Sequence, residues 1–225
     1  MKRIREFKIQ ESICRSETSE EMARRLEAEA KRAIDEIIRA AGVRYETASV
    51  NTWKATTERQ HSVKAAVIDY CRSIRERVEA GEGVVLYGPV GTGKDHLAVG
   101  IARAACLADL SCKWLKGQEW FGSLRDAIES DRTEKELFRS LDCDVLILSD
   151  PLPPMGPLTP YQASMLYRLT EDRYSRGGVI VATVNVADDS EADSRFGAQT
   201  WDRICDRSWK VKCDWPSFRK PSRIV

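Results

Sequence analysis

The feature that most constrains the fold is a glycine-rich loop, GPVGTGKDH, at residues 88–96. The apolar run VVLY leads into this loop, and HLAVGIARAA, which has the spacing of a helix, follows Asp95. A loop between a strand and a helix can aim backbone N–H groups and the positive end of the helix dipole at an anion. Gly88, Gly93 and Lys94 satisfy the pattern G-x-x-x-x-G-K, whose lysine is a mobile charge for nucleotide phosphates. We therefore predict nucleotide binding by the loop residues Gly88, Pro89, Val90, Gly91, Thr92, Gly93, Lys94, Asp95 and His96.

Apolar runs of strand length alternate with helical stretches from residue 84 onward. The runs are VVLY, CKWL, VLIL and VIVATV, and the helical stretches between them are residues 94–106, 119–129 and 160–174. Short apolar runs that alternate with helices are typical of a parallel sheet buried on both faces. The sequence therefore predicts an α/β fold with helices on both faces of a parallel sheet.

The N-terminal region has a different pattern. Residues 1–15 form a basic arm, and the following stretch has apolar residues at helical spacing up to Gly42. Thr18 and Glu21 form a capping box that predicts the start of this helix, and Gly42 predicts its end. We divide the chain into residues 1–42 and an ATP-binding domain at 43–225, within which a second helix is predicted at 61–80. The first helix either packs on its own domain or binds a partner.

Bulk composition excludes several classes of protein. The formal net charge of +1 gives no overall attraction to nucleic acid. Seven cysteines without a C-x-x-C spacing, and only two histidines, argue against structural zinc. With no signal peptide and no apolar run of membrane-spanning length, we expect a cytoplasmic protein that does not insert into a membrane.

Polar residues end two of the predicted strands. In DVLILSDP, Ser149 and Asp150 follow four apolar residues, and Asn185 ends VIVATVN. A P-loop ATPase needs an acidic strand end near the loop to hold Mg²⁺ and to position water. We therefore predict that Asp150 and Asn185 are catalytic, and that Asp95, Ser149 and Asp150 hold the metal.

At these motifs the chain resembles the bacterial helicase-loader branch of the AAA+ ATPases and the related IstB-like helpers of insertion-sequence transposition. The similarity runs through VRYETASVNTW, GPVGTGKDHLA, DVLILSD, VIVATVN, TWDRICD and VKCDWPSFRK. The resemblance implies an AAA+ P-loop fold without a C-terminal helical lid, and ATP with Mg²⁺ as cofactors.

The resemblance also implies roles for residues outside the loop. Arg203 matches an arginine finger that reaches a neighbouring subunit's ATP, which implies self-association, and Arg219 matches an arginine that touches the nucleotide in its own subunit. Family members contact single-stranded DNA after the second strand, and this chain offers cations and rings there: Lys113, Lys116, Trp120, Phe121 and Arg125. The alternative is that Trp120 and Phe121 belong to the core. The implied protein partner is a replicative helicase or a transposase.

Two residues depart from the usual ATPase pattern. Asp95 stands where a hydroxyl normally follows the lysine, and Ser149 stands where the strand normally ends in a carboxylate. One hypothesis is a reciprocal exchange that keeps one hydroxyl and one carboxylate at the metal. The alternatives are a one-residue slip that brings Asp150 to the metal, and a decayed site.

Three functions fit these motifs. The first is an ATPase that loads a replicative helicase on single-stranded DNA, and its close alternative is a transposition helper. A non-hydrolysing switch, assembled by ATP, is the third. A small P-loop kinase fits less well, because Asn185 and the terminal WPSFR have no role in it.

Overall fold

The computed structural model of the chain describes residues 18–129 and 134–219. The strands are β1 (Val84–Tyr87), β2 (Cys112–Lys116), β3 (Val145–Ser149), β4 (Val179–Val184) and β5 (Trp209–Lys212). The helices are α2 (Ser19–Ala41), α3 (Glu58–Arg72), α4 (Ile74–Glu79), α5 (Lys94–Leu107), α6 (Gly117–Glu129), α7 (Glu134–Arg139), α8 (Pro160–Ser175), α9 (Asp189–Phe196) and α10 (Ala198–Cys205), with a 3-10 turn, η1 (Val43–Tyr45).

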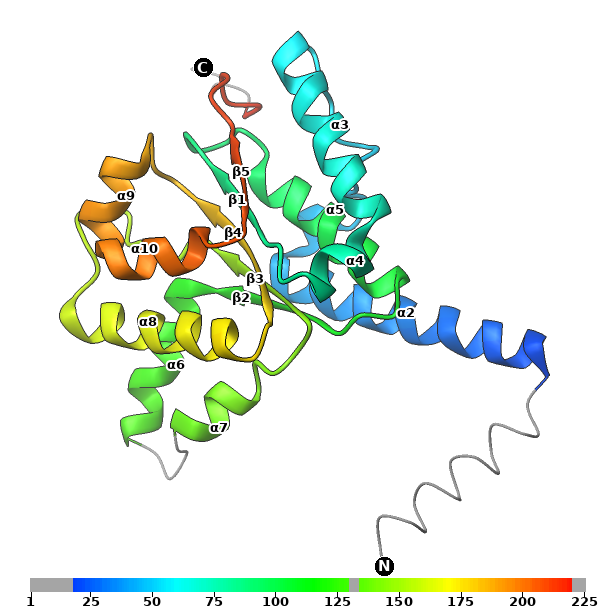
Figure 1. Ribbon diagram of the computed structural model, residues 1–225, viewed down its shortest axis with the longest axis horizontal. Coiled ribbons are helices and arrows are strands. Elements are labelled where there is room, and N and C mark those ends of the chain that lie inside the picture. The colour runs from blue at the N-terminus through cyan, green and yellow to red at the C-terminus, as the bar shows by residue number, and fades with distance from the viewer. Residues whose placement is uncertain (1–17, 130–133, 220–225) are drawn as a thin grey trace, which may run out of the picture.

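The strands form one five-stranded sheet in the order β2-β3-β4-β1-β5, with every neighbouring pair parallel (Figure 1). This arrangement confirms the predicted parallel sheet. The edge strand β5 was not predicted, because its side chains are only partly buried and WKVK has no continuous apolar run. Since the strands are parallel, their carboxyl ends meet at one edge of the sheet.

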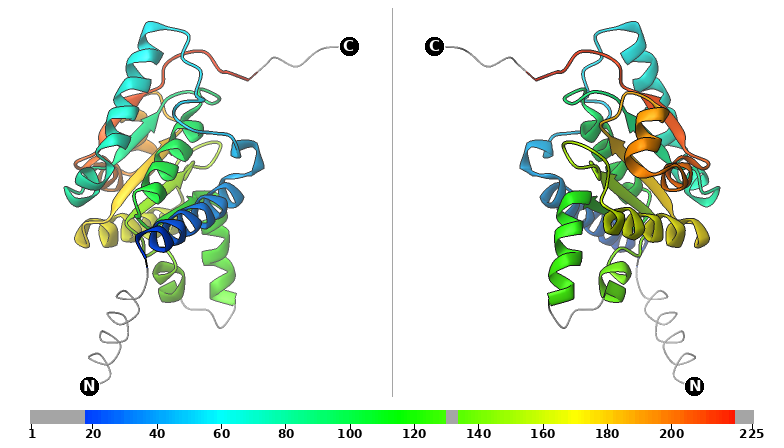
Figure 2. Two further views of the ribbon diagram at one scale, coloured as in Figure 1. Left: turned by 90° about the vertical axis from the view of Figure 1, so that its right-hand side faces the viewer. Right: turned by 90° about the vertical axis from the view of Figure 1, so that its left-hand side faces the viewer.

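Helices cover both faces of the sheet (Figure 2). Alternate residues of one strand point to opposite faces, so Ile147 of β3 packs with α5 residues such as Leu97 and Ile101. Its neighbours Leu146 and Leu148 pack on the other side with Leu166 and other residues of the helices that follow β2 and β3. The predicted layers are thus confirmed, and β1, β2, β3 and β4 each contribute to two apolar cores.

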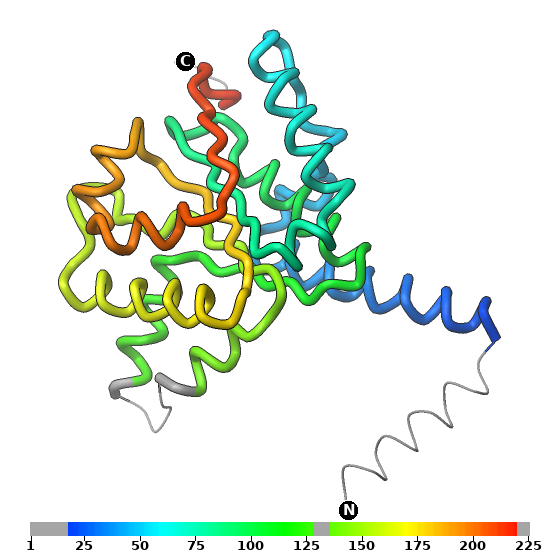
Figure 3. The backbone as a smooth tube through the Cα atoms, in the orientation of Figure 1, coloured from blue at the N-terminus to red at the C-terminus, as the bar shows by residue number. Residues whose placement is uncertain are grey.

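Helix α2 begins and ends where the sequence predicts. Thr18 and Glu21 form the capping box, and Gly42 follows the last turn with a φ of 119°. The last turns of α2 pack on α5 and β2, where Ile37 and Ala41 are buried in the core. Toward its N-terminus α2 extends away from the sheet, and Leu26 is 40% exposed (Figures 1 and 3). The predicted basic arm lies outside the described residues.

The single helix predicted at residues 61–80 is two helices, α3 and α4. Thr57 caps the start of α3 with a capping box to Gln60. The break falls at Ser73, whose hydroxyl donates to the Asp69 carbonyl at 3.2 Å and accepts from Arg77 at 3.1 Å. A serine side chain that bonds the preceding turn in this way competes with the regular helix ladder. The apolar residues keep their helical spacing across Ser73, so the sequence pattern does not indicate the break. None of the helices within residues 18–129 and 134–219 has the length and apolar character needed to cross a membrane.

A buried arginine, Arg173 of α8, joins the helix to the amino ends of β3 and β4. Its side chain is 4% exposed. Its guanidinium donates to the carbonyls of Cys143, Asp144 (2.9 Å) and Val179 (3.0 Å). Backbone carbonyls at the ends of buried strands need such donors, because leaving them without a partner costs free energy.

We therefore expect Arg173→Met to lower the free energy of unfolding by about 3 kcal/mol, because the three carbonyls lose their donor while most of the apolar stem is kept. Urea denaturation followed by circular dichroism measures the change. The control is Arg176→Met in the same helix, since Arg176 makes only exposed ion pairs and its loss should cost less than about 1 kcal/mol. Equal losses for both variants would contradict the role assigned to Arg173.

Candidate nucleotide-binding site

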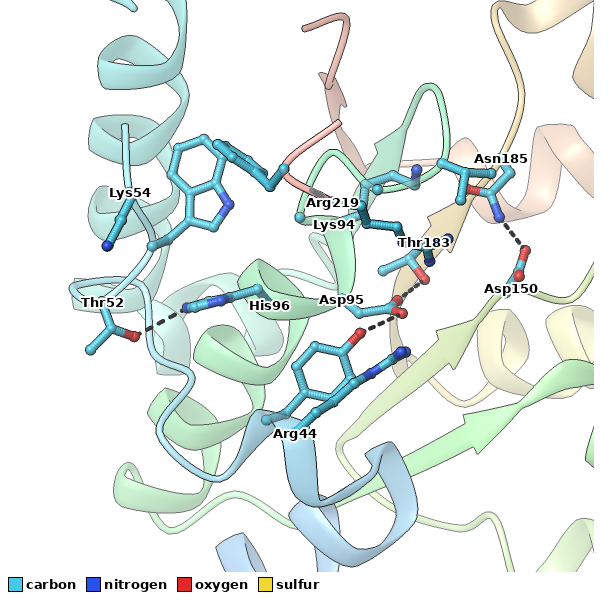
Figure 4. A pocket seen from close by; sticks show the side chains of 16 residues that line it. Arg44, Thr52, Lys54, Lys94, Asp95, His96, Asp150, Thr183, Asn185 and Arg219 are labelled. Carbon is cyan, nitrogen blue, oxygen red and sulfur yellow. Dashed lines mark hydrogen bonds between the residues drawn. The ribbon is translucent and has the colours of Figure 1, made fainter. Parts of the chain in front are cut away.

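A cavity of about 710 Å³ lies at the carboxyl ends of β1, β3 and β4, where ligands of open α/β sheets bind (Figure 4). It is lined by Arg44, Tyr45, Thr52, Trp53, Lys54, Val90, Gly91, Gly93, Lys94, Asp95, His96, Asp150, Thr183, Asn185, Phe218 and Arg219. The predicted loop, both polar strand ends and Arg219 therefore contribute to one cavity, although they are far apart in the sequence.

The glycines of the loop are required by its backbone and its neighbours. Gly93 is left-handed, with a φ of 85°, and directly precedes the first residue of α5. A Cβ atom at Gly93 would lie 2.5 Å from Nε1 of Trp53, and one at Gly91 would lie 2.1 Å from the hydroxyl of Ser217. A side chain at either position would strain the backbone and collide with these neighbours.

Lys94 is buried beneath the loop. Its Nζ atom donates to the carbonyls of Gly88 at 2.8 Å and Pro89 at 2.7 Å. Burial lowers the pKa of Lys94, and the nearby carboxylates of Asp95 and Asp150 act in the opposite direction. A phosphate group would offer this ammonium a better partner than two carbonyls, because both partners would then be charged.

The segment after β5 supports the loop from behind. Trp215 Nε1 donates to the Thr92 carbonyl at 2.9 Å, and the Phe218 amide donates to the Gly91 carbonyl at 2.9 Å. The rings of Trp215 and Phe218 both pack edge-on against Trp53. This segment corresponds to the motif WPSFR, and it brings Arg219 to the cavity.

Asp95 receives three side-chain hydroxyl groups. Thr183 Oγ1 lies 2.7 Å from its Oδ1 atom (Figure 4). Ser149 Oγ lies 3.3 Å from the same atom, and the Tyr45 hydroxyl lies 3.2 Å from Oδ2. β3 reaches the site in the register of an unslipped strand, because its last residue, Ser149, pairs with Thr183 and is buried beside Asp95. A hydroxyl and a carboxylate therefore meet here with their two positions exchanged.

Asp150 and Asn185 form a second polar pair at the cavity. Asn185 Nδ2 donates to Asp150 Oδ1 at 2.7 Å. Asp150 has a positive φ of 45°, which turns its side chain away from the line of β3. Burial raises the pKa of Asp150, and the charge of Asp95 raises it further. A carboxylate oriented by an amide can orient a water molecule, which is the predicted role of this pair.

The His96 ring bonds the connector before α3. It lines the cavity, but its Nε2 atom donates to the Ser49 carbonyl at 3.0 Å and lies 3.1 Å from Thr52 Oγ1. Burial lowers the pKa of His96, which favours the neutral ring. In this arrangement the imidazole holds the connector before α3 against α5.

Arg195 organises the proline-rich loop between Asp150 and α8. Its guanidinium donates to the carbonyls of Pro153, Gly156 (3.1 Å) and Asn185 (3.2 Å), and pairs with Glu191. The loop is thereby joined to the end of β4. No sequence pattern indicated this role for Arg195.

Arg203 does not line the cavity. Its side chain lies on α10, where it pairs with Glu171 at 2.9 Å and stacks over the Tyr174 ring at 4.6 Å. The ion pair raises the pKa of Arg203, which stays charged. An action of Arg203 on a nucleotide therefore needs a second copy of the chain, and it stays a prediction.

The predicted stacking platform for single-stranded DNA is wrong in its aromatic part. Trp120 is 4% and Phe121 2% exposed, and both rings belong to the core beneath α6. Nearby, Lys116 pairs with Glu119, and Lys113 donates to the Ser140 carbonyl. The spacing of α6 places both rings on its inner face, so they cannot stack on bases.

The residues around Asp95 fit a hard cation. Carboxylate and hydroxyl oxygens of Asp95, Ser149, Asp150 and Thr183 gather here, and Mg²⁺ is commonly held by one or two carboxylates together with nucleotide phosphates. Among residues 18–129 and 134–219 there is no cluster of three or more His, Cys, Asp or Glu side chains of the kind that would hold a metal alone. The donor set thus suits Mg²⁺ that arrives with a nucleotide.

Seven cavity residues were missed by the sequence analysis: Arg44, Tyr45, Thr52, Trp53, Lys54, Thr183 and Phe218. Thr183 could have been predicted from the sequence, because it stands two residues before Asn185 on a strand, and alternate residues share a face. Tyr45 and Trp53 lie in the connector before α3, which has no periodicity that would assign its side chains to a face.

The fold and the loop define this protein as an α/β P-loop nucleotide-binding protein. Within that class the chain belongs to the family described as IstB-like ATP binding protein, whose model matches residues 15–224.

Two relatives and two solved structures illustrate the similarity. An insertion-sequence ATP-binding protein of Mycobacterium tuberculosis is 27% identical, and the match covers 65% of this chain and 59% of the relative. The ATP-binding protein of insertion sequence IS21 from Pseudomonas aeruginosa is 29% identical, and the match covers 63% of this chain and 54% of the relative. The chain thus spans little more than half the length of these relatives. The DnaC helicase loader superposes with a TM-score of 0.68 at 17% identity, and the match covers 76% of this chain and 99% of that structure. AMPPCP-bound DnaA from Aquifex aeolicus superposes with a TM-score of 0.59 at 11% identity, and the match covers 74% of this chain and 50% of that structure.

We expect Trp215→Phe to lower the free energy of unfolding by about 1–3 kcal/mol more than Trp114→Phe does. The first change leaves the buried Thr92 carbonyl without its donor, whereas Trp114 Nε1 is buried without a hydrogen-bond partner. Both changes remove a similar area of ring, so chemical denaturation of the two variants isolates the hydrogen bond. Equal losses would show that the segment after β5 does not support the loop in this way.

Proposed function

We propose that this protein is an ATP-driven assembly factor that acts on a transposase during movement of an insertion sequence. The observation that carries the proposal is the family match over residues 15–224, together with a phosphate loop, Asp95 and the Asp150–Asn185 pair at one cavity. Its curated relatives are named as ATP-binding proteins of insertion sequences, which supports a transposase rather than a helicase as partner.

Helicase loading on single-stranded DNA, the first hypothesis from the sequence, has less support. The likeness to DnaC at 17% identity is a likeness of fold. The aromatic residues that would have stacked on single-stranded DNA are buried. A transposase gene beside this one would support the proposal, and replication genes there would support loading.

In the proposed mechanism the loop amides and Lys94 bind the phosphates, and Arg219 contacts the nucleotide from the segment after β5. Asp95 and Asp150 would hold Mg²⁺, with the Ser149 hydroxyl bonded to Asp95, and the bound metal would neutralise phosphate charge. The Asp150–Asn185 pair orients the attacking water. Arg203 of a neighbouring copy stabilises the charge that builds on the γ-phosphate.

Asp95 should make nucleotide binding depend strongly on Mg²⁺, because a bare carboxylate beside the phosphates repels them. We expect wild type to bind a non-hydrolysable ATP analogue at least about tenfold more tightly with Mg²⁺ than with EDTA. Asp95→Asn should bring this ratio close to one, and Ser149→Ala should reduce it. Calorimetric titration measures both affinities.

The control for these variants is Asp142→Asn. Asp142 is an exposed carboxylate before the amino end of β3, at the opposite end of the strand from the cavity. It should keep the wild-type ratio. An unchanged ratio in both Asp95→Asn and Ser149→Ala would exclude the exchange of hydroxyl and carboxylate at the metal.

Arg203→Ala should lower steady-state ATP turnover by about a thousandfold or more, the usual effect of losing an arginine finger. Arg207→Ala, which removes an exposed arginine nearby on the same surface, is the control and should keep wild-type turnover. Mixing Arg203→Ala with Lys94→Ala protein should restore part of the activity, because each copy supplies what the other lacks.

Full turnover by Arg203→Ala would disprove the trans role. A wild-type protein that binds ATP without any turnover, with and without DNA, would instead support the non-hydrolysing switch.

A further inference from the structure

The hydroxyl groups around Asp95 come from three separate parts of the chain. Tyr45 lies in η1 directly after α2, Ser149 ends β3, and Thr183 lies near the end of β4. The hydrogen bond from Thr183 is the shortest of the three, at 2.7 Å. Hydrogen bonds to a carboxylate are stronger than neutral ones, and among these three the Thr183 contact has the best distance for an O–H donor, so we treat it as the main restraint on the Asp95 side chain.

Thr183 is well placed to act as a fixed donor. It is 2% exposed, and it pairs with Ser149 on one side and Leu86 on the other, in the centre of the sheet. A β-branched side chain on a strand has few rotamers, and a buried hydroxyl needs a partner. Its backbone carbonyl also accepts from the Asp150 amide at 3.0 Å. One residue thus bonds the carboxylate of Asp95 through its side chain and the backbone of Asp150 through its carbonyl.

The two oxygens of Asp95 differ in what they can still bind. Each carboxylate oxygen accepts about two hydrogen bonds. Oδ1 already accepts from Thr183 and Ser149, whereas Oδ2 accepts only from Tyr45. A cation would therefore find its open position on Oδ2.

We propose that Thr183 is a positioning residue for the Mg²⁺–nucleotide site, which holds Oδ1 of Asp95 so that Oδ2 faces the cation. Ser149 then shares this positioning role instead of contacting the metal. The inference rests on the proposed function, since it needs Asp95 to hold Mg²⁺.

The test compares Thr183→Val, which removes the hydroxyl at nearly constant volume, with Thr183→Ser, which keeps it. We expect Thr183→Val to weaken binding of a non-hydrolysable ATP analogue about tenfold in Mg²⁺ and to leave binding in EDTA unchanged. Thr183→Ser should bind like wild type in both conditions. Calorimetric titration of the full-length proteins gives all of these affinities.

Thr170→Val is the matched control, because Thr170 is 1% exposed in α8 and donates to the Tyr167 carbonyl, away from the cavity. It should bind like wild type. If Thr183→Val does not unfold cooperatively, Thr183→Ala replaces it in the same comparison.

The outcomes separate the two proposals. Equal loss of affinity in Mg²⁺ and in EDTA, or no loss in either, would overturn the role of Thr183. A wild-type protein whose binding is the same with Mg²⁺ and EDTA would instead overturn the metal site proposed above.

Discussion

The site depends on one constraint, the parallel pairing of β1, β3 and β4. Parallel strands end at the same edge, so the loop after β1, Asp150 after β3 and Asn185 after β4 meet although they are far apart in the chain. Pairing also fixes the register, which places Thr183 beside Ser149. A shift of one residue would turn both hydroxyls to the opposite face of the sheet and away from Asp95.

The loop itself is held from two sides. Trp53 packs on Gly93 from the connector before α3, and Trp215 and Phe218 bond the loop carbonyls from the segment after β5. The glycines make this support possible, because a Cβ at Gly91 or Gly93 would collide with the residues that pack there. The same segment brings Arg219 to the cavity, so the phosphate loop and a predicted nucleotide contact are ordered together.

Asp95 places a negative charge beside the phosphate-binding loop, where a hydroxyl is usual. Hydroxyls from Thr183, Ser149 and Tyr45 surround the carboxylate, where a metal-binding P-loop usually has the opposite arrangement. Tyr45 is the last residue of η1, the short turn that joins α2 to the connector, so the carboxylate is also linked to the end of the N-terminal helix, whose first turns extend from the body.

The sequence by itself determined the loop, the alternation of strands and helices, the capping of α2, and Ser149, Asp150 and Asn185 as strand ends. These features are local, since periodicity, glycines and caps act within a few residues. Only the tertiary structure decided that Trp120 and Phe121 are core, that Arg195 holds the proline-rich loop, and that Thr183 and Tyr45 reach Asp95. These contacts join residues tens of positions apart, and their geometry depends on sheet register and packing, which local patterns do not encode.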